Sequence, residues 1–479
     1  MIEVSAIRRT GVAAALLTLC IALPLQAREA TSAWAVPAHG VIGVEEAHLT
    51  PEFWIGRLPD PDRMRLDRAA IAAQNARLFR IDPSMHDLRV LPAVLSREQI
   101  ATWIERLSRR PQKALYGIDG TPIPEANLDA LDADVALKAI PATQATRYGL
   151  VVHRANLRTF PTALRVFSTL GDTDIDRFQE SALFPGDPVA IVHASRDGDW
   201  WFVVSPRYAA WIEKRHVAEG SAAQVFGYAG KSPYRVVTGA TVETVDTRER
   251  PEFSRLQLDM GLRLPLSTTH APDQPVNGQH PYTAHVVELP TRNAHGALHF
   301  APALLPKRAD SAPDYLPLTP ANIIRQGFKF LGERYGWGHM YDGRDCSGFV
   351  AEVYRSMGVE LPRNTGDQAK SPALDRVAFN ETTSRSAREA AVRALQVGDL
   401  VYIPGHMMMV IGAIDGEPYV IHDTTGLSYL TTAGALRRSV LNGVSVSPLT
   451  PLMFNQRERY IDRMTAIARL RPITQASGE

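Results

Sequence analysis

Apolar residues recur every three to four positions in two early segments, residues 65–79 and 96–110, with charged residues between them. This spacing predicts two amphipathic helices. Ser96, with Glu98 close behind it, is typical of a helix start. Each helix is expected to pack on its neighbours through one apolar stripe, and we assign residues 28–138 to a mainly helical N-terminal segment.

From about residue 140 the pattern changes to short runs that alternate with a period of two. These runs cover residues 148–161, 186–195 and 196–217. They are rich in β-branched and aromatic residues and predict strands. Asp197 and Gly198 lie between two of them, as in a tight hairpin. Trp200, Trp201 and Trp211 are expected to be core and surface aromatics of a small barrel.

An Arg-x-Asn-x-Arg start, a Gly-Asp turn and a Trp-rich hairpin make residues 139–219 resemble a bacterial SH3-type domain. A weaker copy follows, in which residues 234–246 and 282–290 alternate in the same way, and it predicts a second small barrel over residues 220–305. The Pro-rich residues 304–320 are typical of an extended linker. Mixed helical and strand patterns beyond it indicate an α+β domain.

The first 27 residues have the pattern of a secretory signal, with two arginines followed by an apolar run over residues 11–23. This run is too short to cross a bilayer core of about 30 Å as a helix. We expect cleavage after Ala27 and export to the periplasm or cell envelope. Two alternatives stay open: lipidation at Cys20, which the preceding Leu19 disfavours, and an uncleaved anchor.

Composition narrows the classes further. The 479 residues include 52 Lys and Arg and 51 Asp and Glu, for a formal charge of +1. This balance gives no reason to expect a nucleic-acid partner. The chain has two cysteines, Cys20 and Cys346, which excludes a disulfide scaffold and a cysteine-rich zinc site. Cleavage leaves Cys346 alone, so no intramolecular disulfide partner remains for it. No metal, cofactor or stable membrane span is expected.

Candidate chemistry begins at Cys346. The residues after it have apolar positions at helical spacing up to Gly358, a plausible C-terminal stop. Asp345 stands at the N-cap position, which places the thiol in the first turn. Free backbone N–H groups and the helix dipole are expected to lower the pKa of that thiol. Gly348 is expected to keep the turn slim for a substrate backbone.

Two histidines downstream complete a candidate site. Residues 396–425 predict three strands, whose apolar runs are 400–403, 407–411 and 419–421. His406 opens the second strand and His422 ends the third. Adjacent antiparallel strands could bring the imidazoles together, so that His406 takes the thiol proton and His422 fixes its orientation.

These residues resemble the NlpC family of bacterial cell-wall cysteine peptidases, a circularly permuted relative of the papain fold. The matching pieces are RYGWG, DCSGFV, LPRNTGDQ, VGDLVYI, GHMMMVIG and VIHDT, in the family's order within residues 320–430. The resemblance implies an α+β chain. A permuted papain-like peptidase domain within residues 306–479 would follow two SH3-like barrels and the N-terminal helical segment, as in one multidomain branch of the family.

The resemblance also implies a role for each matching residue. Cys346 matches the nucleophile, His406 the base, His422 the third polar residue and Tyr335 the tyrosine whose hydroxyl lies near the oxyanion. Asp345 and Ser347 stand where family members bind the free amine and backbone of the substrate. The family often has Trp-Gly-Gly where residues 337–339 are Trp-Gly-His, so the shape of that loop stays open. Arg363 matches a recurrent position that is more structural than catalytic.

The activity implied is hydrolysis of peptidoglycan stem peptides, or of muropeptide fragments, between γ-linked D-glutamate and a diamino acid such as diaminopimelate. The barrels could bind cell-wall peptide or glycan at a distance, or one could wall off the cleft and select stems with a free N-terminal alanine. Because the first barrel borders the cleft in related multidomain enzymes, the second role is the expected one. The protein is expected to act as a monomer. Two other functions stay open: a non-catalytic wall-binding protein, and an amidase or acyltransferase on the same fold.

Overall fold

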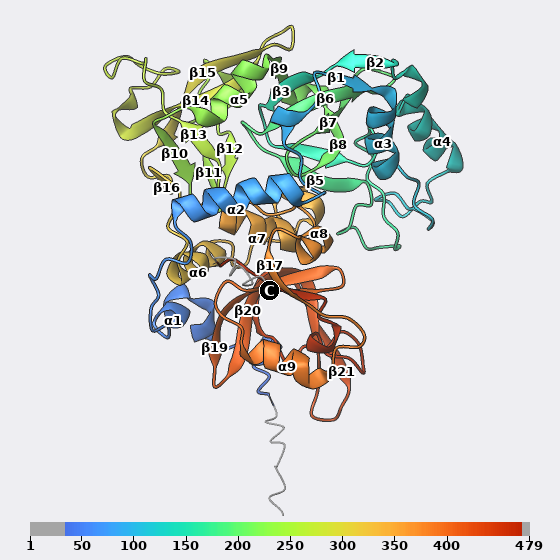
Figure 1. Ribbon diagram of the computed structural model, residues 1–479, viewed down its shortest axis with the longest axis vertical. Coiled ribbons are helices and arrows are strands. Elements are labelled where there is room, and N and C mark those ends of the chain that lie inside the picture. Colours follow the sequence, from blue (N-terminus) through green and yellow to red (C-terminus); the bar gives the residue numbers. More distant parts are fainter. Residues whose placement is uncertain (1–33, 472–479) are drawn as a thin grey trace, which may run out of the picture. The chain divides into compact units, whose positions relative to one another are not determined.

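The structure, a computed structural model, describes residues 34–471 (Figure 1), and the expected signal segment with Cys20 and Ala27 lies outside them. Helices and antiparallel sheets are mixed, so the α+β prediction is confirmed. Within the described part of the chain, no helix combines the length and apolar character that a membrane crossing requires.

The N-terminal segment is mainly helical. Its elements are η1 (Glu46–Leu49), α1 (Pro51–Ile55), α2 (Arg68–Ile81), η2 (Leu88–Val90), β1 (Val94–Ser96), α3 (Arg97–Leu107), α4 (Glu125–Asp134), η3 (Leu137–Ala139) and β2 (Thr143–Ala145). Both predicted helices are present as α2 and α3. Ser96 caps α3 as expected, but Gln99 completes the capping box with it rather than Glu98.

A seven-stranded antiparallel sheet forms the next unit, in the order β5-β4-β8-β7-β6-β3-β9. Its strands are β3 (Arg147–Val151), β4 (Ala155–Arg158), β5 (Gln179–Leu183), β6 (Pro188–Ala194), β7 (Trp200–Val204), β8 (Ala209–Glu213) and β9 (Val217–Gly220), with η4 (Lys214–His216) before β9. The turn at Gly198, with φ +79°, joins β6 to β7 as a hairpin. Trp200, Trp201 and Trp211 are all buried, so the expected surface aromatics are absent from this set.

A second β unit follows α5 (Ala222–Gly230) and has a core of its own. It contains β10 (Tyr234–Val237), β11 (Thr241–Glu243), η5 (Pro251–Phe253), β12 (Gln257–Asp259), β13 (Arg263–Pro265), η6 (Pro281–Thr283), β14 (Ala284–Arg292), β15 (Leu298–Pro306) and β16 (Ser311–Ala312). The linker expected over residues 304–320 is partly strand, because β15 runs to Pro306 and β16 pairs with β10. Proline is tolerated at such strand ends.

The last unit places helices against a six-stranded sheet in the order β17-β22-β18-β19-β20-β21. Its elements are α6 (Pro320–Phe328), η7 (Trp337–Asp342), α7 (Cys346–Arg355), α8 (Thr365–Lys370), β17 (Asp375–Ala378), α9 (Arg385–Arg393), β18 (Leu400–Ile403), β19 (His406–Ile414), β20 (Glu417–Leu430), β21 (Leu436–Pro448), η8 (Ile461–Arg463) and β22 (Ala466–Arg469). Helix α7 contacts α6, β19 and β20.

Strand β20 is longer than the sequence pattern indicated. His422 was expected to end it, but the strand continues to Leu430 because it pairs along its length with β21. Much of the first half of β21 is exposed and polar, which hid this strand from the apolar pattern.

Hydrogen bonds attach the N-terminal segment to the last unit. On α2, the Gln74 side chain donates to the Ala373 carbonyl at 2.8 Å and the Asn75 side chain donates to the Gly358 carbonyl at 2.8 Å. Trp54 of α1 packs against Tyr419 of β20. Through these contacts the helical segment packs against the last unit and does not stand as a separate domain.

A buried arginine joins the second β unit to the last unit. Arg344 is 0% exposed and donates to Glu352 of α7 at 2.8 Å, to Glu333 at 3.0 Å and to Asp259 of β12 at 2.6 Å. Arg154, between β3 and β4 of the first β unit, also forms an ion pair with Asp259. The first β unit, the second β unit and the last unit therefore share one cluster of charged side chains, and the Arg344 guanidinium at its centre is buried.

We predict that Arg344→Met lowers the free energy of unfolding by about 3 kcal/mol, because it leaves buried carboxylates without their cation. Thermal denaturation of the variant beside Arg438→Met, an exposed arginine on β21, measures the effect. Adding Asp259→Asn to Arg344→Met is expected to restore part of the loss. Equal melting temperatures for the two arginine variants would contradict this account.

Candidate active site

The thiol of Cys346 lies in the first turn of α7, as predicted. Asp345 caps the helix by accepting the Gly348 N–H at 2.8 Å. Cys346 is 6% exposed, and its Sγ is 3.5 Å from Thr365 Oγ1 at the start of α8. The structure gives a packing reason for Gly348. A Cβ there would lie 2.5 Å from Cε1 of His339, so the glycine makes room for that ring.

The two predicted histidines meet across neighbouring strands. Nε2 of His406, at the start of β19, is 2.8 Å from Nδ1 of His422 on β20. Nε2 of His422 is in turn 3.1 Å from Oγ of Ser447 on β21. If His422 donates to Ser447, its Nδ1 accepts from His406, and Nδ1 of His406 is left free to take a proton. Ser447 is fully buried, so it holds one end of this relay in place.

The thiol lies beside this relay and beside Tyr335. The N–H of Met407, the residue after His406, is close enough to Cys346 to lower the pKa of the thiol. Burial raises the pKa of Tyr335 above its ordinary value, and the charge of Cys346 adds to the effect. The predicted nucleophile, base, third polar residue and tyrosine therefore come together in one region of α7, β19 and β20.

The charge state of the thiol differs from the expectation. Burial, followed by the negative charge of Asp345, raises the pKa of Cys346 to about 12, against the effect of the helix N-terminus. Burial also lowers the pKa of His406 to about 4. In the free site the pair is a neutral thiol and a neutral imidazole. Formation of a thiolate in this site would require transfer of the thiol proton to a neighbouring base.

Asp345 and Ser347 are held by a buried arginine. Arg363 donates to both carboxylate oxygens of Asp345, at 2.8 and 3.1 Å, and to Ser347 Oγ at 3.0 Å. Burial alone would raise the pKa of Asp345, but Arg363 and then His339 lower it to about 2. Ser347 and the Gly338 N–H also donate to this carboxylate.

His339 gives the loop before α7 its shape. Its backbone has φ +67°, and its ring lies between Arg363, 2.8 Å from Nδ1, and Glu352, 3.1 Å from Nε2. The position where the family often has a second glycine thus needs a left-handed backbone, which glycine adopts freely. In this chain His339 adopts the left-handed backbone. Its ring contacts Arg363 on one side and, on the other, Glu352, which also binds Arg344.

The first β unit borders the site directly. Ser181 of β5 accepts a hydrogen bond from Arg363 Nε at 2.7 Å. Gln179 of the same strand donates to the Gly338 carbonyl at 2.8 Å and accepts from the Trp337 indole at 3.1 Å. The barrel that meets the cysteine region is therefore the first one.

Sequence reasoning missed several of these residues. Ser447 and Thr365 carry no pattern that marks them before the fold is known, although Thr365 lies within a matched motif. His339 is marked only as a departure from the family's Trp-Gly-Gly, with no role assigned to its ring. Asp423, next to His422, is fully buried, and neither carboxylate oxygen has a hydrogen-bond partner within residues 34–471. Burial raises its pKa well above the ordinary value. In the sequence, Asp423 lies within the matched piece VIHDT, which gave only a weak indication of its importance.

The comparisons agree with this geometry. Residues 332–446 match the NlpC/P60 family, and residues 165–213 match the SH3 domain of the SH3b1 type. The chain therefore contains an NlpC/P60 domain with an SH3b-type domain N-terminal to it.

Two curated relatives have the same name, gamma-D-glutamyl-L-lysine dipeptidyl-peptidase. The protein of Bacillus subtilis (strain 168) is 44% identical over 54 residues, 11% of this chain and 18% of the relative. That of Bacillus cereus (strain ATCC 10987 / NRS 248) is 26% identical over 215 residues, 42% of this chain and 56% of the relative. The chain thus spans less than two thirds of either relative.

A solved structure shows the same fold over most of the chain. It is described as a novel NlpC/P60 endopeptidase from Photobacterium damselae subsp. piscicida, with a TM-score of 0.67 and 16% identity. The match covers 85% of this chain and 94% of that one. The combination of helical segment, β units and peptidase domain therefore occurs together in another protein.

We predict that Cys346 is alkylated slowly at neutral pH. The raised pKa keeps the thiol protonated, and the thiolate is the reactive form. The iodoacetamide rate, followed by mass spectrometry of the Cys346 peptide, should keep rising with pH past about 9, beyond the ordinary thiol pKa near 8.5. An inflection below about pH 7 would instead show a thiolate paired with imidazolium.

Proposed function

We propose that this chain is a cysteine endopeptidase of peptidoglycan. It would hydrolyse stem peptides between γ-D-glutamate and an L-diamino acid such as diaminopimelate. The observation that carries the proposal is the proton relay of His406, His422 and Ser447 beside a thiol at a helix start. A wall-binding protein without catalysis has no use for a buried relay of this kind.

The relay supplies the proton transfers that the reaction needs. His406 takes the proton of the Cys346 thiol through Nδ1 as sulfur attacks the γ-amide carbonyl, which forms a tetrahedral intermediate. The Cys346 N–H and the Tyr335 hydroxyl stabilise its oxyanion, and each such donor contributes about 3 kcal/mol in comparable sites. His406 then protonates the leaving amine, and water attacks the thioester to release the D-glutamyl product.

The names of the two relatives support the class of peptide bond that we propose for this chain. Both are gamma-D-glutamyl-L-lysine dipeptidyl-peptidases, which names a γ-D-glutamyl bond to a diamino acid in those proteins. We extend that bond type to this chain and keep diaminopimelate as the expected diamino acid. A tripeptide with lysine in place of diaminopimelate is the direct comparison for this choice.

Selection of a free N-terminal amine needs a carboxylate near the site. Asp345 is the candidate from sequence, but five hydrogen bonds from Arg363, Ser347, Gly338 and Gly348 already occupy its two oxygens. An ammonium group therefore needs a further acceptor. We propose that it comes from the first β unit.

Glu180 meets that need. It lies on β5 next to Ser181, and its carboxylate accepts hydrogen bonds from Thr159 and Tyr208, both at 2.5 Å. Burial raises its pKa, and Arg363 lies near enough for its charge to act in the other direction. A half-buried carboxylate without a directly bound cation would gain most from a substrate ammonium group.

An open cavity lies beside Tyr208, the residue that donates to Glu180, although Glu180 itself does not line it. It has a volume of about 380 Å³ and is bounded by Trp103 of α3, by Tyr208 and by Asn364. Asn364 precedes Thr365, whose hydroxyl is next to the Cys346 sulfur. The first barrel would thus wall the cleft at the N-terminal end of the substrate, and in this proposal a glycan-linked stem is excluded there.

Two other functions remain as outcomes of the test. The permuted papain fold also suits an amidase or acyltransferase on other amides, which would use the same thiol and relay. A wall-binding protein would use the β units alone. The products formed from a wall digest separate all three.

We predict that the chain splits stem peptides with a free N-terminal alanine after D-glutamate and that Cys346→Ala abolishes the products, since the nucleophile is lost. Mass spectrometry of matched digests measures both. Arg438→Ala, at an exposed position of β21, is the matched control with an intact thiol. An unchanged digest with retained wall binding would support the binding protein, and products cut at another bond would support an amidase.

We also predict that Glu180→Gln lowers kcat/KM for the free-amine tripeptide about tenfold, because a charge-assisted hydrogen bond is lost. The N-acetylated tripeptide should be cleaved poorly by both proteins and without that difference. Glu105→Gln, on the exposed face of α3, is the matched control. Equal rates on intact sacculi and on free tripeptide would refute selection of a free amine.

A further inference from the structure

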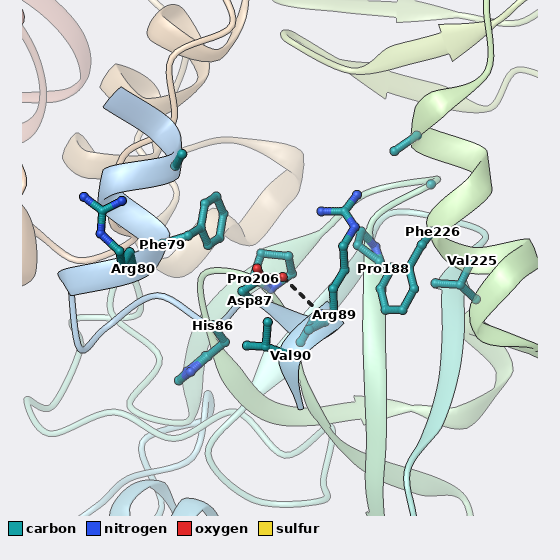
Figure 2. Close-up of a pocket in the computed structure, with 14 residues that line it drawn as sticks. Phe79, Arg80, His86, Asp87, Arg89, Val90, Pro188, Pro206, Val225 and Phe226 are labelled. Atoms are coloured by element: carbon teal, nitrogen blue, oxygen red, sulfur yellow. Dashed lines mark hydrogen bonds between the residues drawn. The ribbon is translucent and has the colours of Figure 1, made fainter. Parts of the chain in front are cut away.

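A second cavity lies apart from the cysteine region, and none of the residues around it touches the relay. It encloses about 570 Å³ between α2, the η2 turn, the first β unit and α5. Figure 2 shows Phe79 and Arg80 on α2 on one side and Val225 and Phe226 on α5 on the other. A volume of this size is in the range of small-molecule and peptide-fragment sites.

The walls of this cavity are mainly apolar. Phe79, Pro188, Pro206 and Phe226 contribute most of the large surfaces, and Val90 is 75% exposed within it. Exposed apolar residues scattered singly are ordinary, but a walled group of them marks a binding surface. The cavity therefore suits a ligand with methyl or methylene groups in its body.

Two arginines give the cavity its charge. Across the described residues 34–471, neither Arg80 nor Arg89 takes part in an ion pair, and neither guanidinium donates a hydrogen bond. The Arg89 guanidinium lies over the Phe226 ring, 5.5 Å from its centroid. Asp87 also lines the cavity, but its Oδ1 accepts the Arg89 N–H at 3.0 Å to cap η2.

We propose that this cavity is a second binding site for a carboxylate-bearing peptidoglycan stem peptide, separate from the site of hydrolysis. The proposal rests on the proposed function, which supplies the class of ligand. A γ-linked D-glutamate keeps its α-carboxylate, and a C-terminal diaminopimelate adds two more, so the tripeptide offers an anion to each of the two arginines. Alanine methyl and diamino-acid methylene groups match the apolar walls. Guanidinium and carboxylate form strong paired hydrogen bonds.

A second stem held here would keep the enzyme on its substrate while another stem is cleaved. Binding at two sites on one chain raises the effective concentration of the linked ligand. Cleavage of short, unlinked peptides would not gain from this site. Cleavage of cross-linked stem peptides with free N-terminal alanines would gain from it.

The test uses the full chain with Cys346→Ala and the tripeptide L-Ala-γ-D-Glu-diaminopimelate in isothermal titration calorimetry. We expect two sites per chain. Replacing both arginines, Arg80→Gln with Arg89→Gln, should weaken one site at least tenfold and leave the other. The matched control is Arg437→Gln with Arg438→Gln on the exposed part of β21. A single site, or two sites unaffected by the Arg80 and Arg89 changes, overturns the proposal.

A second variant tests the cavity without removing a cation. Val90→Glu adds a carboxylate among the apolar walls and should repel the ligand at this site. Val440→Glu, at a position that is 78% exposed on β21, is its control. The same peptide with all three carboxylates amidated should bind only weakly at the cavity. If Val90→Glu and Val440→Glu bind alike, the cavity is not the second site.

Hydrolysis of the tripeptide by the unmodified chain is measured separately. Cleavage with a single binding site would defeat the second site and leave the peptidase proposal intact. No cleavage of any stem peptide would defeat the proposed function, whatever the calorimetry shows. The two failures therefore give different results.

Discussion

The ion pair between Arg363 and Asp345 fixes the position of the thiol. Asp345 caps α7, so its carboxylate decides where the first turn begins, and Arg363 holds both of its oxygens. The same guanidinium reaches Ser181 in the first β unit and the ring of His339. A single buried cation thus connects the helix cap, the loop before it and a neighbouring domain.

The site keeps its reactive groups uncharged until they act. A helix N-terminus favours a thiolate, but burial and the nearby carboxylate of Asp345 have the larger effect on Cys346. His406 is held neutral by its own burial. The relay through His422 to Ser447 then orients the base, so neither the thiol nor the imidazole adds an unpaired charge to the buried site.

Much of the site could be predicted because its residues lie at the ends of regular elements. The spacing of apolar residues and the capping residues Asp345 and Gly358 predict helix α7. His406 begins its strand, as expected. What could not be predicted depends on contacts between distant parts of the chain. Ser447 sits on a polar strand, His339 adopts a left-handed backbone, and burial reversed the expected pKa shift of Cys346.

The contact between Ser181 and Arg363 also bears on how such chains can be recombined. A domain that only tethers an enzyme to its substrate can be exchanged for another such domain without loss of the active-site structure. Here the first β unit supplies a hydrogen bond to the arginine that holds the helix cap, and the second supplies Asp259 to the Arg344 cluster. Replacing either unit by an unrelated wall-binding domain would remove part of the catalytic scaffold, so these domains are expected to be inherited together as one block.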